Sequence, residues 1–272
     1  MRLRINAQLT RALLVDFIRR ETLRSGFQRV VLGVSGGIDS AVVLALAVEA
    51  LGSGSVVGAM LPYRTSHPSS LRDAETVLCR YRARSVRIDI TPMVDAYLTR
   101  FPDADRRRRG NKMARERMSI LYDLSAIHEG LVLGTSNKSE LLLGYGTLHG
   151  DMASALNPLG DLYKTQVRQL ARHLGLPERL VRKHPTADLW QGQTDEKELG
   201  FTYSELDRLL YFLVDLRGQP EEAARLGFPR PMVRHVREMI RRSQYKRRLP
   251  LIAKVSNRTI GVDFRYPRDW GV

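Results

Sequence analysis

The segment Gly33-Val34-Ser35-Gly36-Gly37-Ile38-Asp39-Ser40 has the composition of a phosphate-binding loop. Its two adjacent glycines let the backbone approach a phosphate without an intervening Cβ, and they permit positive φ angles. The loop leads into a stretch with helical character, and the first N–H groups and the dipole of a helix favour an anion. Ser35 and Ser40 add hydroxyl donors. These residues predict a site for the phosphates of a nucleotide.

Asp39 indicates a cation at the same site. A carboxylate beside phosphates is repelled unless a cation lies between them, and Mg²⁺ is suited to that position. The segment lacks both the Lys-Ser/Thr ending of a Walker A loop and the spacing of a dinucleotide-binding G-x-G-x-x-G. The simpler alternative is a tight turn with a helix cap. It explains Gly36, Gly37 and Asp39 individually, but it does not explain why the whole segment follows a predicted strand.

Alternating strands and helices are expected around this loop. Short apolar runs predict strands at 29–34, 55–61, 85–90 and 131–134, and the stretches between them predict helices at 39–51, 69–83, from 92 and at 110–129. Such alternation predicts an α/β fold with a doubly wound parallel sheet and helices on both faces. An amphipathic helix at 7–24 precedes the sheet. Beyond residue 161 the sequence pattern predicts helices, which are interrupted at Pro177, Pro185, Gly192, Pro220 and Pro231.

The bulk composition is that of a packed globular protein that attracts anions. The chain has 272 residues, 43% hydrophobic and 27% charged, which excludes a disordered chain. Its net charge of +15 favours polyanions such as ATP, dinucleotides or nucleic acid without choosing among them. Part of the charge is clustered, in Arg106, Arg107, Arg108 and Arg109 and in Arg241, Arg242, Lys246, Arg247 and Arg248. The first cluster is as well explained by a solvated face as by a contact zone for anions.

The single cysteine and the absence of long apolar stretches indicate a cytoplasmic protein. Cys79 is alone, which excludes an intramolecular disulfide and a zinc site built from several cysteines. Its neighbours predict a small buried residue rather than a nucleophile. No stretch reaches the roughly 20 apolar residues that span a bilayer, and the N-terminus lacks the layout of a secretory signal.

Residues 33–40 resemble the pyrophosphatase loop of the N-type ATP pyrophosphatases, which cleave ATP between its α and β phosphates and transfer AMP to an oxygen. Further motifs follow the order seen in NAD synthetases, over residues 30 to 250. They are Ala114-Arg115-Glu116-Arg117-Met118, residues 133–140, residues 157–165, Pro185-Thr186-Ala187-Asp188-Leu189 and residues 194–200. The resemblance implies an adenine nucleotide alpha-hydrolase-like fold with extra C-terminal helices. It implies one domain over 1–272, with a core at about 28–185 and a helical part at about 186–272.

The resemblance also implies roles for individual residues. ATP is expected to contact residues 33–40 together with Thr135, Lys164 and Thr186, and magnesium to be held by Asp39 and Glu140. Asp39 and Lys164 are the expected catalytic residues. Arg115, Tyr245 and Lys246 match positions that contact deamido-NAD. Glu140 follows a strand-end loop parallel to the first, so both carboxylates can reach one cation. For Glu140, Lys164 and Arg115 the alternative is a charged residue in solvent.

The implied reaction is ATP-dependent amidation of deamido-NAD to NAD through an adenylated carboxylate, releasing pyrophosphate and AMP. Ammonia is the expected nitrogen donor because no glutaminase segment is found before residue 30 or after residue 250. The sequence leaves open whether a separate glutaminase chain supplies this ammonia. A homodimer is expected, without membrane or nucleic-acid partners. Leu148 and Ala155 occupy positions where short bacterial enzymes commonly carry a Lys and an Asp, so recognition of the nicotinate side is expected to differ.

Two other functions use some of the same residues. A tRNA-modifying ATP pyrophosphatase would share the loop and the positive charge, but it predicts an RNA-binding extension and catalytic cysteines, which are not found. The second alternative is a non-catalytic module that binds a nucleotide or nucleic acid, but this function does not explain why Asp39, Glu140 and Lys164 occur together. Residues 188–200 are polar and end in Gly200, which fits either a lid over the site or a mobile surface loop.

Overall fold

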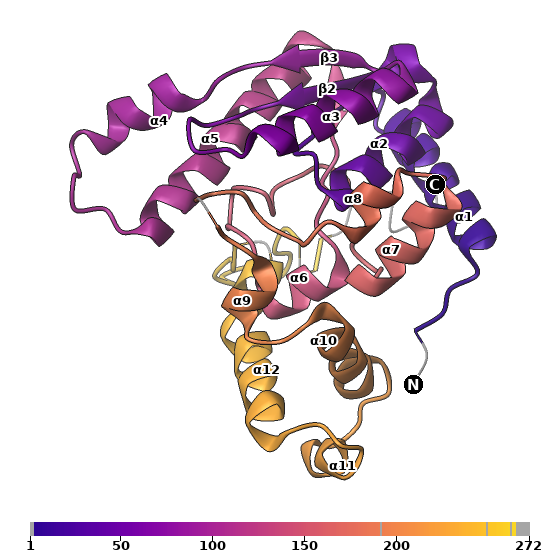
Figure 1. Ribbon diagram of the computed structural model, residues 1–272, viewed down its shortest axis with the longest axis vertical. Coiled ribbons are helices and arrows are strands. Elements are labelled where there is room, and N and C mark those ends of the chain that lie inside the picture. Colours follow the sequence, from indigo (N-terminus) through magenta and orange to yellow (C-terminus); the bar gives the residue numbers. More distant parts are fainter. Residues whose placement is uncertain (1–2, 191, 249, 262, 265–272) are drawn as a thin grey trace.

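A parallel sheet lies at the centre of the computed structural model, which describes residues 3–190, 192–248, 250–261 and 263–264 (Figure 1). Its strands are β1 (Arg29–Gly33), β2 (Val56–Met60), β3 (Arg84–Arg87) and β4 (Gly130–Val132), in the order β3-β2-β1-β4. Every pairing is parallel, and Val31 of β1 lies opposite Val57 of β2 and Val132 of β4. The predicted parallel α/β sheet is confirmed.

Helices connect the strands and continue after the sheet. The first part of the chain contains α1 (Ala7–Arg24), α2 (Ile38–Leu51), α3 (Pro68–Tyr81), α4 (Thr91–Leu98), α5 (Arg106–Ile127) and α6 (Lys138–Leu143). The second part contains α7 (Lys164–His173), α8 (Glu178–Arg182), α9 (Asp195–Leu199), α10 (Tyr203–Leu210), α11 (Pro220–Arg225), α12 (Arg230–Arg242) and a short 3-10 helix, η3 (Gln244–Arg247).

Two apolar clusters cover the two faces of the sheet because successive strand residues point to opposite sides. Val30 and Leu32 of β1 belong to the cluster formed with α2, α3 and α7, whereas Val31 belongs to the cluster formed with α4 and α5. All three side chains are fully buried. The near-continuous apolar run that predicted β1 is therefore explained by burial on both faces.

A third apolar cluster joins the C-terminal helices. Tyr203, Leu206 and Leu210 of α10 pack with Leu143 of α6 and Val236 of α12. In Figure 1 α10, α11 and α12 lie at the end of the molecule away from the sheet. These are the extra C-terminal helices that the family resemblance implies.

Helix α5 begins earlier than the sequence pattern indicates. The expected start was Gly110, but the helix starts at Arg106 because the carboxylate of Asp105 accepts a hydrogen bond from the Arg108 amide at 2.7 Å and caps the first turn. The cluster of four arginines, 106 to 109, is thus the first turn of a long helix.

The expectation for Cys79 was wrong, since its side chain is exposed. Helix α3 buries Ala74, Val77 and Leu78, which share one face. The next residue falls on the opposite face.

The order of the strands creates one switch point. After β1 the chain passes to β2 and β3 on one side, and it then returns to place β4 on the other side of β1. Ligands of open parallel sheets bind at such a point, outside the carboxyl ends of the strands. Residues 33–40 follow β1 and residues 133–140 follow β4, so both predicted loops lie there. No helix within the described residues is long and apolar enough to cross a membrane.

Candidate functional site

A cavity of about 650 Å³ opens at the switch point. Its walls come from the loops after β1, β2 and β4, from one face of α5, and from the segment that leads from α8 into α9. This volume is that of a small-molecule or cofactor site. Seven of the eight residues of the predicted phosphate loop line it, Gly36 being the exception.

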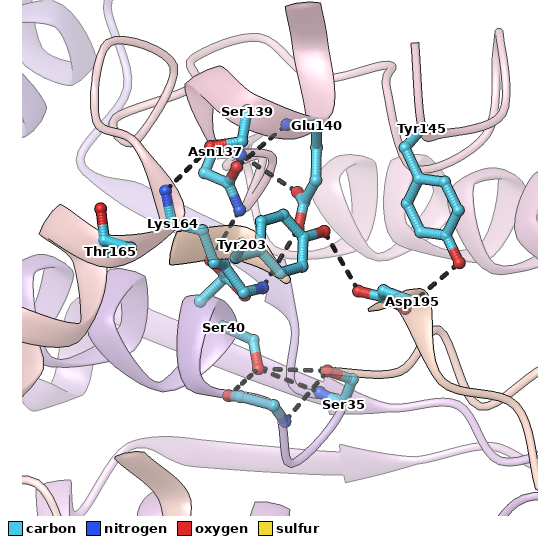
Figure 2. Close-up of polar contacts among 12 residues, drawn as sticks. Ser35, Ser40, Asn137, Ser139, Glu140, Tyr145, Lys164, Thr165, Asp195 and Tyr203 are labelled. Carbon is cyan, nitrogen blue, oxygen red and sulfur yellow. Dashed lines mark hydrogen bonds and ion pairs between the residues drawn. The ribbon is translucent and has the colours of Figure 1, made fainter. Parts of the chain in front are cut away.

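Hydrogen bonds within residues 33–40 fix the shape of the loop (Figure 2). The Ser40 hydroxyl donates to the Gly37 carbonyl oxygen at 3.0 Å and accepts from the Ser35 amide at 3.3 Å. The Ser35 hydroxyl in turn accepts from the Gly37 amide at 3.2 Å. The two serines therefore shape the loop as well as line the cavity.

Gly36 is required by the close approach of a neighbouring chain segment. Its φ is +75°, and a Cβ at this position would lie 2.0 Å from the carbonyl oxygen of Ser70. The Gly36 carbonyl accepts from the Lys183 ammonium at 3.2 Å, and the same ammonium pairs with Asp73 at 2.9 Å. Lys183 and Ser70 thus hold the back of the phosphate loop.

Lys164, Asp39 and Glu140 meet at the centre of the cavity wall. The Lys164 ammonium lies 2.5 Å from Asp39 Oδ2 and 3.1 Å from Glu140 Oε1, and the lysine is 3% exposed. Asn137 links the two carboxylates: its Nδ2 donates to Asp39 Oδ1 at 3.0 Å, and its side-chain oxygen accepts from the Glu140 amide in a capping box at the start of α6. Figure 2 shows the side chains of Lys164, Glu140 and Asn137 converging.

Burial and mutual charge set the ionisation of this group. Burial raises the pKa of Glu140 to about 7, an effect that the charge of Lys164 opposes and that of Asp39 increases. Burial alone would lower the pKa of Lys164, but the charges of Asp39 and Glu140 outweigh it and raise that pKa above its ordinary value. Lys164 is therefore a fixed cation inside the cavity.

Asp207 of α10 holds the helices that carry Glu140 and Lys164. Its fully buried carboxylate accepts from the Ser139 hydroxyl at 2.5 Å and from the Thr165 amide at 2.8 Å. The Ser139 hydroxyl also accepts from the Lys164 amide at 3.0 Å. Burial raises the pKa of Asp207, and the hydrogen bonds from Ser139 and Thr165 counteract it. One carboxylate thus links the first turns of α6 and α7.

A second acidic group lies beside the lysine. Asp195 at the start of α9 is 4% exposed and accepts from the hydroxyls of Tyr145 at 3.2 Å and Tyr203 at 3.3 Å. Tyr145 also donates to Glu198 at 2.8 Å. Burial raises the pKa of Asp195, whereas Lys164 lowers it. Figure 2 shows Asp195 between the two tyrosines.

The donor set fits magnesium. Asp39 and Glu140 offer hard carboxylate oxygens, and both lie within 3.1 Å of one point, the Lys164 nitrogen. Among the residues that the structure describes, no three His, Cys, Asp or Glu side chains gather as a metal site. A Mg²⁺ ion here would take its other ligands from phosphates and water, as is usual for this ion.

The half of the cavity away from Lys164 contains two further cations, Arg107 and Lys246. It is lined by Gly144 to Thr147, by Asn111 and Arg107 of α5, and by Lys246 of η3. The Lys246 ammonium donates to the carbonyl oxygens of Gly144 at 2.8 Å and Gly146 at 2.7 Å, which fixes it at the wall. Burial lowers the pKa of Lys246; the Asp151 carboxylate opposes this effect, and the charges of Arg107 and Arg115 add to it.

The structure brings most of the expected site residues into one cavity. Thr135, Lys164, Thr186 and Lys246 line it with the phosphate loop, Asp39 and Glu140. Besides Gly36, two expected residues do not line it. Arg115 is directed to the Leu148 carbonyl oxygen, 3.1 Å from its Nε, and Tyr245 is 61% exposed.

The segment between Thr186 and α9 lies across the cavity. The Asp188 carboxylate accepts from the His67 amide at 3.0 Å, so the segment reaches the start of α3. Leu189 and Trp190 lie against Gly110 of α5, where an added Cβ would come within 2.9 Å of Leu189. These contacts fit the lid interpretation, which stays a prediction.

Sequence reasoning missed three charged residues of the site: Lys183, Asp195 and Asp207. For Asp207 a signal exists, because it lies at helical spacing among Tyr203, Leu206 and Leu210, the buried face of α10. A carboxylate on an apolar face needs a buried partner. Lys183 and Asp195 give no such signal, because their partners are distant in sequence.

Comparisons with known proteins place this geometry in context. A family model described as NAD synthase matches residues 10–250. An NH(3)-dependent NAD(+) synthetase from Trichlorobacter lovleyi is 57% identical over 270 residues, 99% of either chain. An NMN synthetase structure from Francisella tularensis has a TM-score of 0.83 at 31% identity, covering 92% of this chain and 99% of that one. An NH3-dependent NAD synthetase from Campylobacter jejuni, in complex with the nitrate ion, has a TM-score of 0.79 at 33% identity, covering 92% and 100%.

Proposed function

This chain belongs to the NAD synthase family, and from that premise we propose that it amidates deamido-NAD to NAD with ATP and ammonia. It is a ligase that forms a C–N bond. The observation that carries the assignment to this cavity is the Asp39–Lys164–Glu140 group, whose members come from the starts of α2, α7 and α6.

In the first step the carboxylate of deamido-NAD attacks the α-phosphorus of ATP, and pyrophosphate leaves. Residues 33–40 and the N-terminus of α2 hold the phosphate chain, because amide donors and the helix dipole face the cavity there. The Lys164 ammonium compensates the negative charge that grows on the phosphate oxygens during this attack. A Mg²⁺ ion on Asp39 and Glu140 would supply further charge compensation.

In the second step ammonia attacks the adenylated carbonyl, the C–N bond forms, AMP leaves, and the nitrogen loses a proton. The chain needs no covalent nucleophile for either step, so its contribution is positioning and charge compensation. The adenylate is sensitive to water, and residues 188–190 cover the cavity beside α5. We propose that this segment is the lid.

The other assignments of the family extend to this chain as proposals. ATP contacts residues 33–40, Thr135, Lys164 and Thr186, while Lys246 contacts deamido-NAD. Arg115 and Tyr245, which do not line the cavity of this single chain, reach deamido-NAD only if the substrate extends beyond it.

The family resemblance further supports a cytoplasmic homodimer in which residues 1–272 form one domain. Sedimentation velocity at assay concentration should show the dimer. A monomer that is fully active would contradict the proposed assembly.

The direct experiment measures products. The protein is incubated with ATP, Mg²⁺, ammonium and deamido-NAD, and NAD and AMP are separated by chromatography. Equal amounts of both should appear, and neither should accumulate without ammonium. Lys164→Met is the control, since it removes the central cation while keeping the length of the side chain. If the wild-type protein forms neither NAD nor AMP, the proposed function is wrong.

Deamido-NMN belongs in the same assay because the structural neighbour from Francisella tularensis is an NMN synthetase. We expect a higher kcat/KM for deamido-NAD, since the relative from Trichlorobacter lovleyi, which matches 99% of this chain, is an NAD(+) synthetase. The opposite order would move the substrate assignment to the mononucleotide while leaving the chemistry unchanged.

A further inference from the structure

Four consecutive arginines form the first turn of α5, where the helix dipole disfavours positive charge. Their side chains have separate environments. Arg109 donates to the carbonyl oxygens of Ala104 and Pro102, both at 2.8 Å, and Arg108 lies over the Phe101 ring at 5.4 Å. Of the four, Arg107 alone lines the cavity.

Helical geometry directs Arg107 to the cavity. Arg107, Asn111, Ala114 and Met118 all line it, and their spacing of three or four residues puts them on one face of α5. Among the described residues Arg107 takes part in no hydrogen bond or ion pair. Its guanidinium therefore retains its five donors for a ligand.

The cations of the cavity differ in how they are paired. Lys164 is paired with Asp39 and Glu140 in one half, with Asp195 beside it, whereas Arg107 and Lys246 lie in the other half, where Asp151 is the acidic neighbour of Lys246. Arg107 and Lys246 are close enough for their charges to interact. Two neighbouring cations repel each other, and an anion between them removes that repulsion.

The position of Arg107 indicates contact with deamido-NAD, the second substrate, rather than with ATP. The triphosphate of ATP belongs with residues 33–40, and the carboxylate that attacks it must lie near Lys164. The remainder of that second substrate then extends into the half lined by Gly144 to Thr147, Asn111 and Arg107. Deamido-NAD carries a diphosphate in that remainder, whereas deamido-NMN carries one phosphate.

We propose that the guanidinium of Arg107 binds the diphosphate of deamido-NAD and raises the preference of this chain for the dinucleotide over the mononucleotide. A guanidinium fits this role because its planar donors pair with two phosphate oxygens at once. The inference rests on the proposed function and adds a residue that sets substrate specificity.

The test compares Arg107→Ala with Arg106→Ala and Arg108→Ala, which remove an equal charge from the same turn but not from the cavity wall. Steady-state kinetics are measured for deamido-NAD, deamido-NMN and ATP. We expect Arg107→Ala to raise the KM for deamido-NAD roughly tenfold, the effect of losing one charge-assisted hydrogen bond. The KM for deamido-NMN should rise less, and kcat and the KM for ATP should stay within about twofold. Arg107→Lys should recover part of the loss.

Two results would overturn the inference. One is an unchanged KM for deamido-NAD in Arg107→Ala, and the other is an equal increase in all three alanine variants, which would mean a general effect of net charge. Melting temperatures establish that the variants are folded, as expected for exposed side chains. Failure of the proposed function is distinguishable, because the wild-type protein would then form no NAD at all.

Discussion

Replacing Asp207 tests whether one buried carboxylate holds the two catalytic helices in place. In Asp207→Ala the Ser139 hydroxyl and the Thr165 amide lose their acceptor; Ser139 is fully buried, whereas Thr165 is half-buried. An unsatisfied buried donor costs about 1 to 3 kcal/mol, so the loss at Ser139 alone should lower the free energy of unfolding by about 1 to 3 kcal/mol. For a chain of this size the melting temperature should fall by at least about 2 °C.

Activity should fall beyond the loss of stability. The N-termini of α6 and α7 carry Glu140 and Lys164, and a displacement of about 1 Å at a reacting centre costs up to roughly 100-fold in rate. We therefore expect kcat to fall by roughly 10- to 100-fold at a temperature where the variant is folded, with a smaller change in the KM for ATP. Calorimetry and NAD formation are the assays.

Matched variants separate the hydrogen bonds from the charge. Asp207→Asn keeps an acceptor for Thr165 and should cost less than half as much stability as Asp207→Ala. Ser139→Ala removes the shared hydroxyl, and combining it with Asp207→Asn in a double-mutant cycle should give a coupling energy of about 0.5 kcal/mol or more. An Asp207→Ala protein with wild-type melting temperature and kcat would refute the reasoning.

Three further predictions concern the site and its supports. Asp195→Asn should raise the KM for ammonium several-fold more than the KM for ATP, because it removes a buried negative charge that attracts a cation. Steady-state kinetics that show equal increases in the two KM values would contradict this. Gly36→Ala should abolish tight ATP binding in calorimetry, since its Cβ would meet the Ser70 carbonyl oxygen at 2.0 Å. Gly37→Ala, whose Cβ has a nearest contact of 3.2 Å, should still bind ATP. Equal ATP affinities of the two variants would contradict the role of residues 33–40 in binding phosphate. Hydrogen bonds at the N-cap of α10 lower the pKa of Glu205 below 4.5, so its stabilisation is present above pH 4.5 and is lost as the pH falls through the lowered pKa. Denaturant unfolding should show a stability difference from Glu205→Gln at pH 7 that shrinks toward pH 3, and a constant difference would refute it.

The sequence by itself determined the parallel sheet and the nature of the central loop. Alternating apolar runs and helices allow few other folds, because β-branched runs buried on both faces are typical of parallel strands. Gly36, Gly37 and Asp39 indicated a phosphate and cation site because their chemistry is local: a positive φ, a close approach and a carboxylate are properties of the segment itself.

Only the tertiary structure decided which distant charges meet. Lys164 lies 125 residues from Asp39 along the chain and Asp207 lies 68 residues from Ser139, yet each pair is in hydrogen-bond contact. Sequence spacing carries no information on such contacts, since they depend on how α6, α7 and α10 pack. The four arginines of α5 show the same limit: they are equivalent in sequence, and the rotation of one helix alone directs Arg107 to the cavity and its neighbours elsewhere.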